Sequence, residues 1–332
     1  MNRKILIFYI KLLIISLSAG VVIHRIKLFY EQSDAYSLFF HVSDHFLLLV
    51  IVFLLMAVNW FLEAVKWRVL VTDIQPMKIE ESWRSVLTGL TVGLLTPRRL
   101  GEVGGRILYL GKKNRVTGML SFGVGSMVQT AITLGMGLIA FGFSLAGIPS
   151  DLMKNTHLLV FLSALFFLLI LWTIFNLPAV YRWLNHFSFF RKRQKLFRYL
   201  ENQSRTKILC VFLLGLSRYV TFALQFFLLI RLFGNPLNSY SVFMGTGLMY
   251  LVMTFLPISS LLDLGVRGSV AAYVFGIFTS QTGDIVMASL AIWIINLGVP
   301  AMAGAMLLNP SRDELFGTAL IKRRIQVALR RL

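Results

Sequence analysis

The chain has 332 residues, of which 57% are hydrophobic and 14% charged, and its mean hydropathy is +0.76. Soluble domains carry about 45–50% apolar and about 25% charged residues. The composition therefore argues against a soluble enzyme and excludes a disordered, collagen-like or disulfide-rich chain. The formal net charge is +19, which favours either nucleic acid or an anionic membrane surface as a partner, depending on where the basic residues lie.

Six apolar segments are long enough to span a membrane, which takes about 20 residues. They lie at 5–24, 45–65, 118–146, 157–178, 208–231 and 285–308. Together they predict an all-α polytopic membrane protein with a single transmembrane domain over residues 1–310 and a basic cytoplasmic tail at 311–332. Lys11 interrupts the first segment and no small-residue cleavage site closes it, so we interpret it as a retained helix rather than a signal peptide.

Two further segments, at 83–110 and 240–280, are apolar but broken. Each runs into a proline, Pro97 or Pro257, and continues with charged residues and glycines. Irregular backbone at membrane depth is tolerated where protein or a water-filled cavity covers it. We therefore expect two re-entrant hairpins. The alternative is that both hairpins span the membrane fully, which leaves the same orientation for every other segment.

The basic residues set the predicted orientation. Lys and Arg gather at the N-terminus, in 66–84, 96–115 and 182–207, and in the tail. Because cytoplasmic loops carry the excess of Lys and Arg, we expect both termini to be cytoplasmic. The first hairpin then enters from the cytoplasm and the second from outside, which is compatible with an inverted repeat of the kind that transporters use. Scattered over separate loops, these charges favour anionic lipid headgroups and argue against nucleic acid.

The two broken segments resemble the signatures of the lysylphosphatidylglycerol synthase transmembrane-region family of flippase-like membrane proteins. The first signature is a proline, an arginine, a Gly-Glu pair and a further arginine, and it reads here as Pro97, Arg98 or Arg99, Gly101-Glu102 and Arg106. The second is a proline and serine followed by a Gly-x-Arg turn, and it reads here as Pro257, Ser259 and Gly265-Val266-Arg267. Where the family continues with a glutamate, this chain has Gly268, and Asp263 lies four residues before the arginine.

The resemblance covers most of the chain and implies a helical bundle with re-entrant helices that moves lipids between leaflets. In two-domain members a cytoplasmic aminoacyl-transferase domain follows the membrane part. This chain ends 22 residues after Pro310, so we expect a stand-alone member without that activity.

Charged residues within the membrane segments are the candidate site, because each is costly to insert and persists when it is paired or faces a cavity. The predicted lipid-headgroup residues are Arg98, Arg99, Glu102, Arg106, Arg218, Asp263 and Arg267. The arginines would hold a lipid phosphate through forked hydrogen bonds. The acids would hold those arginines or face a cationic headgroup. The alternative is a set of structural salt bridges that ties the hairpins to the bundle.

Three neighbouring features have open interpretations. Arg218, mid-helix, is expected to face a cavity or an acidic partner. Glu63 is predicted to pair either with Arg218 or a hairpin arginine, or locally with Lys66 or Arg68. The tryptophans are predicted to be interfacial anchors; these are Trp60, Trp67, Trp172, Trp183 and Trp293.

No cofactor or metal is expected. His41 and His45 have the spacing of two ligands on one helical turn, but no further Cys or His lies nearby. A nucleoside-triphosphate loop is also lacking, because Gly104-Gly105-Arg106 is not followed by Lys and Ser or Thr.

The leading hypothesis is a flippase-like protein of the bacterial cytoplasmic (inner) membrane that binds and translocates a phospholipid or lipid-linked headgroup. Two alternatives stay open. One is a non-catalytic membrane partner of an envelope-synthesis or lipid-synthesis enzyme. The other is an intramembrane lipid-headgroup transferase with Glu102 or Asp263 as base, although we expect no enzyme activity.

Overall fold

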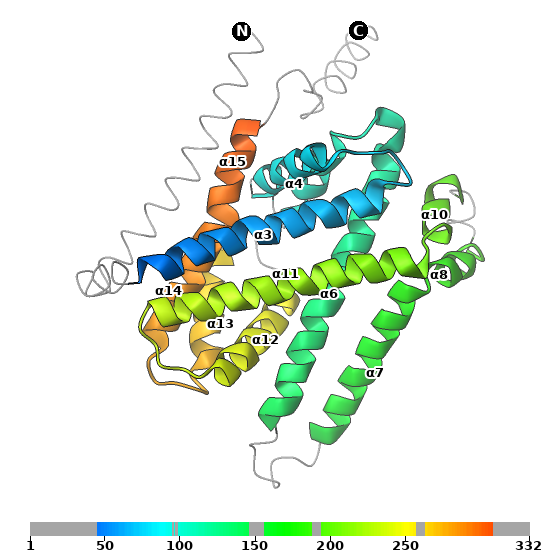
Figure 1. Ribbon diagram of the computed structural model, residues 1–332. Helices are drawn as coiled ribbons and strands as arrows, with labels where there is room; N and C mark the ends of the chain where they lie inside the picture. The colour runs from blue at the N-terminus through cyan, green and yellow to red at the C-terminus, as the bar shows by residue number, and fades with distance from the viewer. Residues whose placement is uncertain are drawn as a thin grey trace, which may run out of the picture.

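The computed structural model describes residues 45–94, 96, 99–145, 156–187, 194–256 and 263–307. The predicted first span at 5–24 and the tail at 311–332 lie outside them. The described part is helical and contains no strand, which confirms the predicted all-α class (Figure 1). Its helices are α3 (Phe46–Val71), α4 (Ile79–Leu94), α5 (Gly101–Ile107), η2 (Lys112–Asn114), α6 (Arg115–Leu145), α7 (Thr156–Phe175), α8 (Leu177–Leu184), α10 (Gln194–Glu201), α11 (Arg205–Leu232), α12 (Ser239–Phe255), α13 (Asp263–Phe275), α14 (Thr282–Trp293), η4 (Ile294–Gly298) and α15 (Val299–Leu307).

Four helical runs are long and apolar enough to cross a membrane: α3, η2 with α6, α11, and the continuous run α14–η4–α15. They coincide with four of the six predicted spans. The prediction at 157–178 is α7, which bends by 87° into α8 and forms a fifth span only if the bent pair counts as one. Pro178 lies in the first turn of α8, and a proline there cannot continue the preceding helix. The described residues thus hold four or five of the six predicted spans, and the remaining one, at 5–24, lies outside them.

The segment at 83–110 forms a helical hairpin. Helix α4 has 16 residues and α5 has 7, so neither is long enough to cross a membrane. The two run antiparallel, because Gly93 lies beside Glu102 while Ser85 Oγ donates to the carbonyl of Arg106 at 3.0 Å. A Cβ added to Gly105 would lie 2.6 Å from the Cα of Gly89. The glycines therefore let the two helices touch along their backbones.

The second broken segment forms a similar hairpin from α12 and α13. Gly245 lies against Phe275, and further along Tyr250 meets Arg267, so these helices also run antiparallel. They have 17 and 13 residues. Pro257 and the turn around it lie outside the described residues.

The order of elements repeats along the chain with the direction inverted. A long helix, a two-helix hairpin and a second long helix occur as α3, α4–α5 and α6, and again as α11, α12–α13 and α14–α15. Helices α3 and α11 pack side by side and antiparallel, since Val52 meets Gln225 and Asn59 meets Arg218 (Figure 1). Because the two leading helices run in opposite directions, the repeats are inverted, as the sequence interpretation allowed.

The packing between the repeats follows the same relation. Helix α15 of the second repeat packs on α4 of the first, and α6 of the first packs on α12 of the second. Both contacts are made through a glycine that touches backbone. A Cβ on Gly304 would lie 2.2 Å from the carbonyl oxygen of Leu87, and one on Gly137 would lie 3.1 Å from that of Gly247. A long helix of each repeat therefore packs against the hairpin of the other repeat.

Chain connectivity places the two hairpins at opposite ends of the bundle. The first begins after the end of α3 and returns to the start of α6, whereas the second begins after α11 and returns to the start of α14. The end that holds the base of the first hairpin is rich in basic residues, namely Arg68, Lys78, Lys112, Lys113, Arg115, Arg182, Arg198, Arg205 and Lys207. The opposite end carries Arg231.

Candidate functional site

A buried carboxylate on α3 is the centre of an ionic network. Glu63 is 5% exposed. Its Oε1 accepts a hydrogen bond from Arg106 Nη1 at 2.7 Å, and its Oε2 accepts from Lys66 Nζ at 2.6 Å and from Arg218 Nη1. One carboxylate thus pairs with cations from α3, α5 and α11. Such a site is expensive to disturb, because removing one partner leaves charges buried without compensation.

The two interpretations of Glu63 prove compatible. It pairs with Arg218 and with a hairpin arginine, and also locally with Lys66. The suggestion of Arg68 is wrong: that side chain turns to the neighbouring loop and donates its Nε hydrogen to the carbonyl of Met77 at 3.1 Å.

Arg106 and Glu102 hold the first hairpin in place. Arg106 is 3% exposed, and its Nη2 donates to Glu102 at 2.6 Å, one helical turn earlier. Its guanidinium lies over the rings of Trp67 and Phe122, at 5.7 Å and 5.1 Å from their centroids. Enclosed by two carboxylates and two rings, Arg106 ties α5 to α3 and α6. These two predicted headgroup residues therefore lie in the structural salt bridges of the alternative interpretation.

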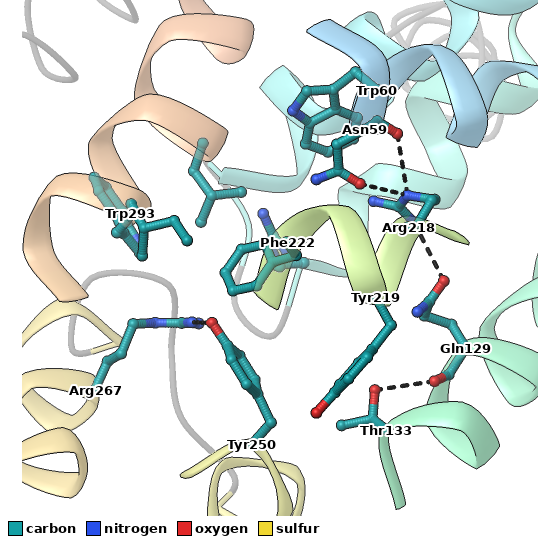
Figure 2. A pocket seen from close by; sticks show the side chains of 13 residues that line it. Asn59, Trp60, Gln129, Thr133, Arg218, Tyr219, Phe222, Tyr250, Arg267 and Trp293 are labelled. Carbon is teal, nitrogen blue, oxygen red and sulfur yellow. Dashed lines mark hydrogen bonds between the residues drawn. The ribbon is translucent and has the colours of Figure 1, made fainter. Parts of the chain in front are cut away.

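A cavity of about 280 Å³ lies beside this network, where the two hairpins and the long helices meet (Figure 2). Three arginines from separate elements line it, together with amides, hydroxyls and aromatic rings. Its lining in the described part of the chain consists of Asn59, Trp60, Arg99, Gln129, Thr133, Arg218, Tyr219, Phe222, Tyr250, Arg267, Ile292, Trp293 and Leu297.

Arg218 joins the network to the cavity. Its Nε donates to the backbone and side-chain oxygens of Asn59 at 3.2 Å and 3.0 Å, and its Nη1 reaches Glu63 and, at 3.4 Å, Gln129 Oε1 (Figure 2). Its Nη2 has no hydrogen-bond partner among the described residues. The guanidinium also lies 5.5 Å from the ring centroid of Trp60. The expectation that Arg218 faces a cavity or an acidic partner is confirmed, since it lines the cavity and also pairs with Glu63.

Arg99 is at the tip of the first hairpin and has unused donors. Its backbone adopts a φ of 56°, a left-handed conformation that costs a non-glycine residue about 1–3 kcal/mol. Its Nη2 is buried and has no hydrogen-bond partner within the described residues. A buried donor without a partner is itself costly, so the fold holds this guanidinium in an unfavourable state at the cavity.

Arg267 brings the second hairpin to the same cavity. Its Nη1 donates to the hydroxyl of Tyr250 at 2.9 Å, and its guanidinium lies 5.5 Å from the centroid of that ring. Figure 2 shows the pair across the cavity from Arg218 and Asn59. The structure thus gathers Arg99, Arg218 and Arg267 of the predicted site. Arg98 and the side chain of Asp263 lie outside the described residues.

A π-helix shapes one wall of the cavity. The turn Ile294–Gly298 is π-helical, a form frequent at functional sites. Pro300 has no N–H to donate to the carbonyl of Asn296 four residues earlier, and Trp60 Nε1 donates to that oxygen instead, at 3.0 Å. Asn59 reaches the side chain of Asn296 at 3.3 Å. This wall is therefore joined to α3 at the residues that position Arg218.

The sequence prediction missed the uncharged lining. Gln129, Thr133, Tyr219, Phe222 and Tyr250 occur in apolar helices where nothing in the sequence separates a cavity residue from a packing residue.

The prediction for the tryptophans is only partly right. Trp60, Trp67 and Trp293 are buried around the arginines, so the prediction of interfacial anchors is wrong for them. The rings of Trp60 and Trp67 pack against the guanidinium groups of Arg218 and Arg106. Trp172 and Trp183 are 56% and 61% exposed, as anchors would be.

Among the described residues, no group of three or more His, Cys, Asp or Glu is arranged to hold a metal ion.

Comparison with known families gives one result. The model of the family described as "Lysylphosphatidylglycerol synthase TM region" matches residues 10–304, which is most of the chain and includes both hairpins. The chain matches no curated protein and no solved structure.

Proposed function

Because the chain belongs to the lysylphosphatidylglycerol synthase transmembrane-region family, we propose that it binds the polar headgroup of a lipid between its two hairpins and carries that headgroup between leaflets. Membership makes it a multi-pass membrane protein of lipid metabolism or transport. Translocation is the proposal, and the acyl chains would remain in the bilayer beside the helices while the headgroup crosses.

The observation that supports this most strongly is that both hairpins contribute an arginine to one cavity. Arg99 from one hairpin and Arg267 from the other line a single cavity with Arg218 of α11. The hairpins come from opposite ends of an inverted repeat, so the cavity lies where access from either side would converge. Interrupted helices at such a place form the substrate sites of many transporters.

We also propose an orientation and a location. The helix ends at the base of the first hairpin carry most of the basic residues of the described part, and such ends face the cytoplasm. The first hairpin would then open to the cytoplasm, with both termini on that side of a bacterial inner membrane. Reporter fusions to the C-terminus test this: an enzyme active only outside the cytoplasm should give no signal there.

The proposal assigns no chemical reaction to the protein. A transferase would need a free base, and the hypothesis named Glu102 or Asp263. Glu102 accepts a hydrogen bond from Arg106 at 2.6 Å, so its action as a base would break the contact that holds α5. The described lining supplies guanidinium, amide, hydroxyl and aromatic groups, which suit binding.

The test is translocation in vesicles of defined composition. The full chain is reconstituted into phosphatidylglycerol–phosphatidylethanolamine vesicles that contain a trace of fluorescently labelled phosphatidylglycerol, and an impermeant reductant bleaches the outer leaflet. We expect vesicles with protein to lose inner-leaflet label, and Arg99→Gln to slow that loss about tenfold, the effect of one charged hydrogen bond.

The matched control is Arg84→Gln. Arg84 lies on the same hairpin but is exposed and pairs with Glu80, so its removal should leave the rate unchanged. Bleaching equal to that of protein-free vesicles would refute translocation. Co-purification of an envelope-synthesis protein that Arg99→Gln leaves intact would then favour the membrane-partner alternative.

A further inference from the structure

The surroundings of the cavity carry an excess of positive charge. Five cations lie in the cavity lining and the adjoining network, namely Lys66, Arg99, Arg106, Arg218 and Arg267, against the two carboxylates Glu63 and Glu102. Both carboxylates belong to the network, and the lining that the structure describes contains none. Counting Asp263 as a third carboxylate would still leave two positive charges in excess. A cationic group in the cavity would therefore meet repulsion, and an anion would not.

Hydrogen-bond donors remain available in the same place. Arg99 Nη2 is buried without a partner among the described residues, and Arg218 Nη2 likewise has none there. Both side chains line the same cavity. Unused donors on two arginines of one cavity suit the oxygens of a phosphate, and a bound anion would also offset their positive charges.

The rest of the lining suits hydroxyl groups. Asn59 and Gln129 supply amides, and Thr133 and Tyr219 supply hydroxyls, all facing the cavity that the arginines line (Figure 2). At about 280 Å³ the cavity is at the small end of ligand sites, a size that suits a headgroup better than acyl chains.

We infer that the cavity selects a headgroup of net negative charge, a phosphate ester with neighbouring hydroxyls, and rejects a headgroup whose phosphate is balanced by an ammonium group. This rests on the proposed function, because it names the class of headgroup for the same cavity. It also sets this chain apart from a carrier of aminoacylated, cationic lipids.

The experiment compares three water-soluble probes on the full chain in mild detergent. They are short-chain phosphatidylglycerol, short-chain phosphatidylethanolamine and free glycerol 3-phosphate. Trp60 and Trp293 line the cavity, so tryptophan fluorescence reports binding. We expect phosphatidylglycerol to bind about tenfold more tightly than phosphatidylethanolamine, and Arg99→Gln to abolish that preference while Arg84→Gln keeps it.

Arg267→Gln serves as a second variant, and thermal unfolding confirms that each variant is folded. Equal affinity for the two lipids, or an unchanged preference in both Arg99→Gln and Arg267→Gln, would overturn the inference. Binding of glycerol 3-phosphate as tight as that of the lipid supports the phosphate chemistry and assigns it to a soluble ester. Weaker binding of glycerol 3-phosphate supports it with a lipid as the source.

The experiments distinguish a failure of headgroup selectivity from a failure of translocation. Arg99-dependent preference for phosphatidylglycerol without translocation in vesicles would uphold the inference and remove transport. Translocation that shows no preference between the two lipids would uphold transport and remove the inference.

Discussion

The two hairpins are equivalent in the repeat but use their arginines differently. In the first, Arg106 lies nine residues after Pro97 and is enclosed by Glu63, Glu102 and two aromatic rings. In the second, Arg267 lies ten residues after Pro257 and lines the cavity against Tyr250. One arginine fixes a hairpin to the bundle, and the other faces the space where a ligand would bind.

The difference follows from the long helices behind each hairpin. Helix α3 presents Glu63 to the first hairpin, and that carboxylate also forms ion pairs with Lys66 and Arg218. Inverted repeats made of similar parts can thus become unequal through one carboxylate on one helix. It follows that substitutions around Glu63 should act mainly on stability, and substitutions at the hairpin tips should act mainly on binding.

The substitution with the largest expected effect on stability is Glu63→Gln. The amide cannot balance three buried cations, so we expect a loss of about 3–5 kcal/mol in stability, the cost of removing one partner from a buried pair. Thermal unfolding of the full chain in detergent measures it. Glu80→Gln is the control, because Glu80 is in an exposed pair with Arg84 and should change stability by less than about 1 kcal/mol. Equal shifts for the two variants would contradict a central role for Glu63.

The difference between the two hairpins is tested by measuring Arg106→Gln and Arg267→Gln in parallel. We expect Arg106→Gln to cost about 3 kcal/mol, because it leaves Glu63 and Glu102 short of a buried partner. Arg267→Gln should cost less than half of that, while lowering lipid translocation more. Unfolding temperature and the vesicle assay on the same preparations separate the two effects. If both variants lose stability equally, the two arginines share one structural role.

Much of the fold could be predicted from the sequence, because apolar length and the positions of Lys and Arg carry that information. The 83–110 segment was recognisable as a hairpin from Pro97 and the glycines that follow it. The 87° bend after α7 was missed, since Asn176 and Pro178 occur near the end of a long run without charged residues. A single proline near the end of such a run looks the same whether the chain continues or turns.

The charged residues of the candidate site could be predicted from the sequence. Which of them line the cavity and which form buried salt bridges could not. The sequence identified Arg99, Arg106, Arg218 and Arg267 by the cost of a charge in a membrane segment. Which of them lines a cavity depends on contacts between residues more than 40 positions apart, such as Arg106 with Glu63 and Arg218 with Asn59. Periodicity within one helix does not contain that information.

A smaller loss of stability is expected from alanine substitutions at the glycines through which the two repeats pack together. In Gly304→Ala the new methyl group would lie 2.2 Å from the carbonyl oxygen of Leu87, and in Gly137→Ala it would lie 2.6 Å from Leu251 Cβ. Overpacking costs about 1–3 kcal/mol, and we expect Gly304→Ala to cost more, because backbone yields less easily than a leucine side chain. Gly142→Ala is the control, since nothing lies within 4 Å of its added Cβ. Thermal unfolding ranks the three variants, and a cost for Gly142→Ala as large as for Gly304→Ala would contradict this reading of the packing.

The smallest effect belongs to the segment that joins the repeats. Tyr199 of α10 donates its hydroxyl hydrogen to the carbonyl of Leu70 at 2.9 Å, so Tyr199→Phe should cost about 0.5–1.5 kcal/mol. Burial, with the negative charge of Asp73 adding to it, raises the pKa of Tyr199 to about 12, against about 10 for an unfolded tyrosine.

The sign of the pH effect follows from that difference. Above pH 10 the unfolded chain loses this proton while the folded protein keeps it, so the contribution of Tyr199 is present below pH 10 and is lost as the pH rises towards 12. Stability measured from pH 8 to 11 should therefore fall more steeply in the wild type than in Tyr199→Phe. Parallel curves would show that Tyr199 is not buried against α3, and the joining segment would then contribute nothing to holding the first repeat.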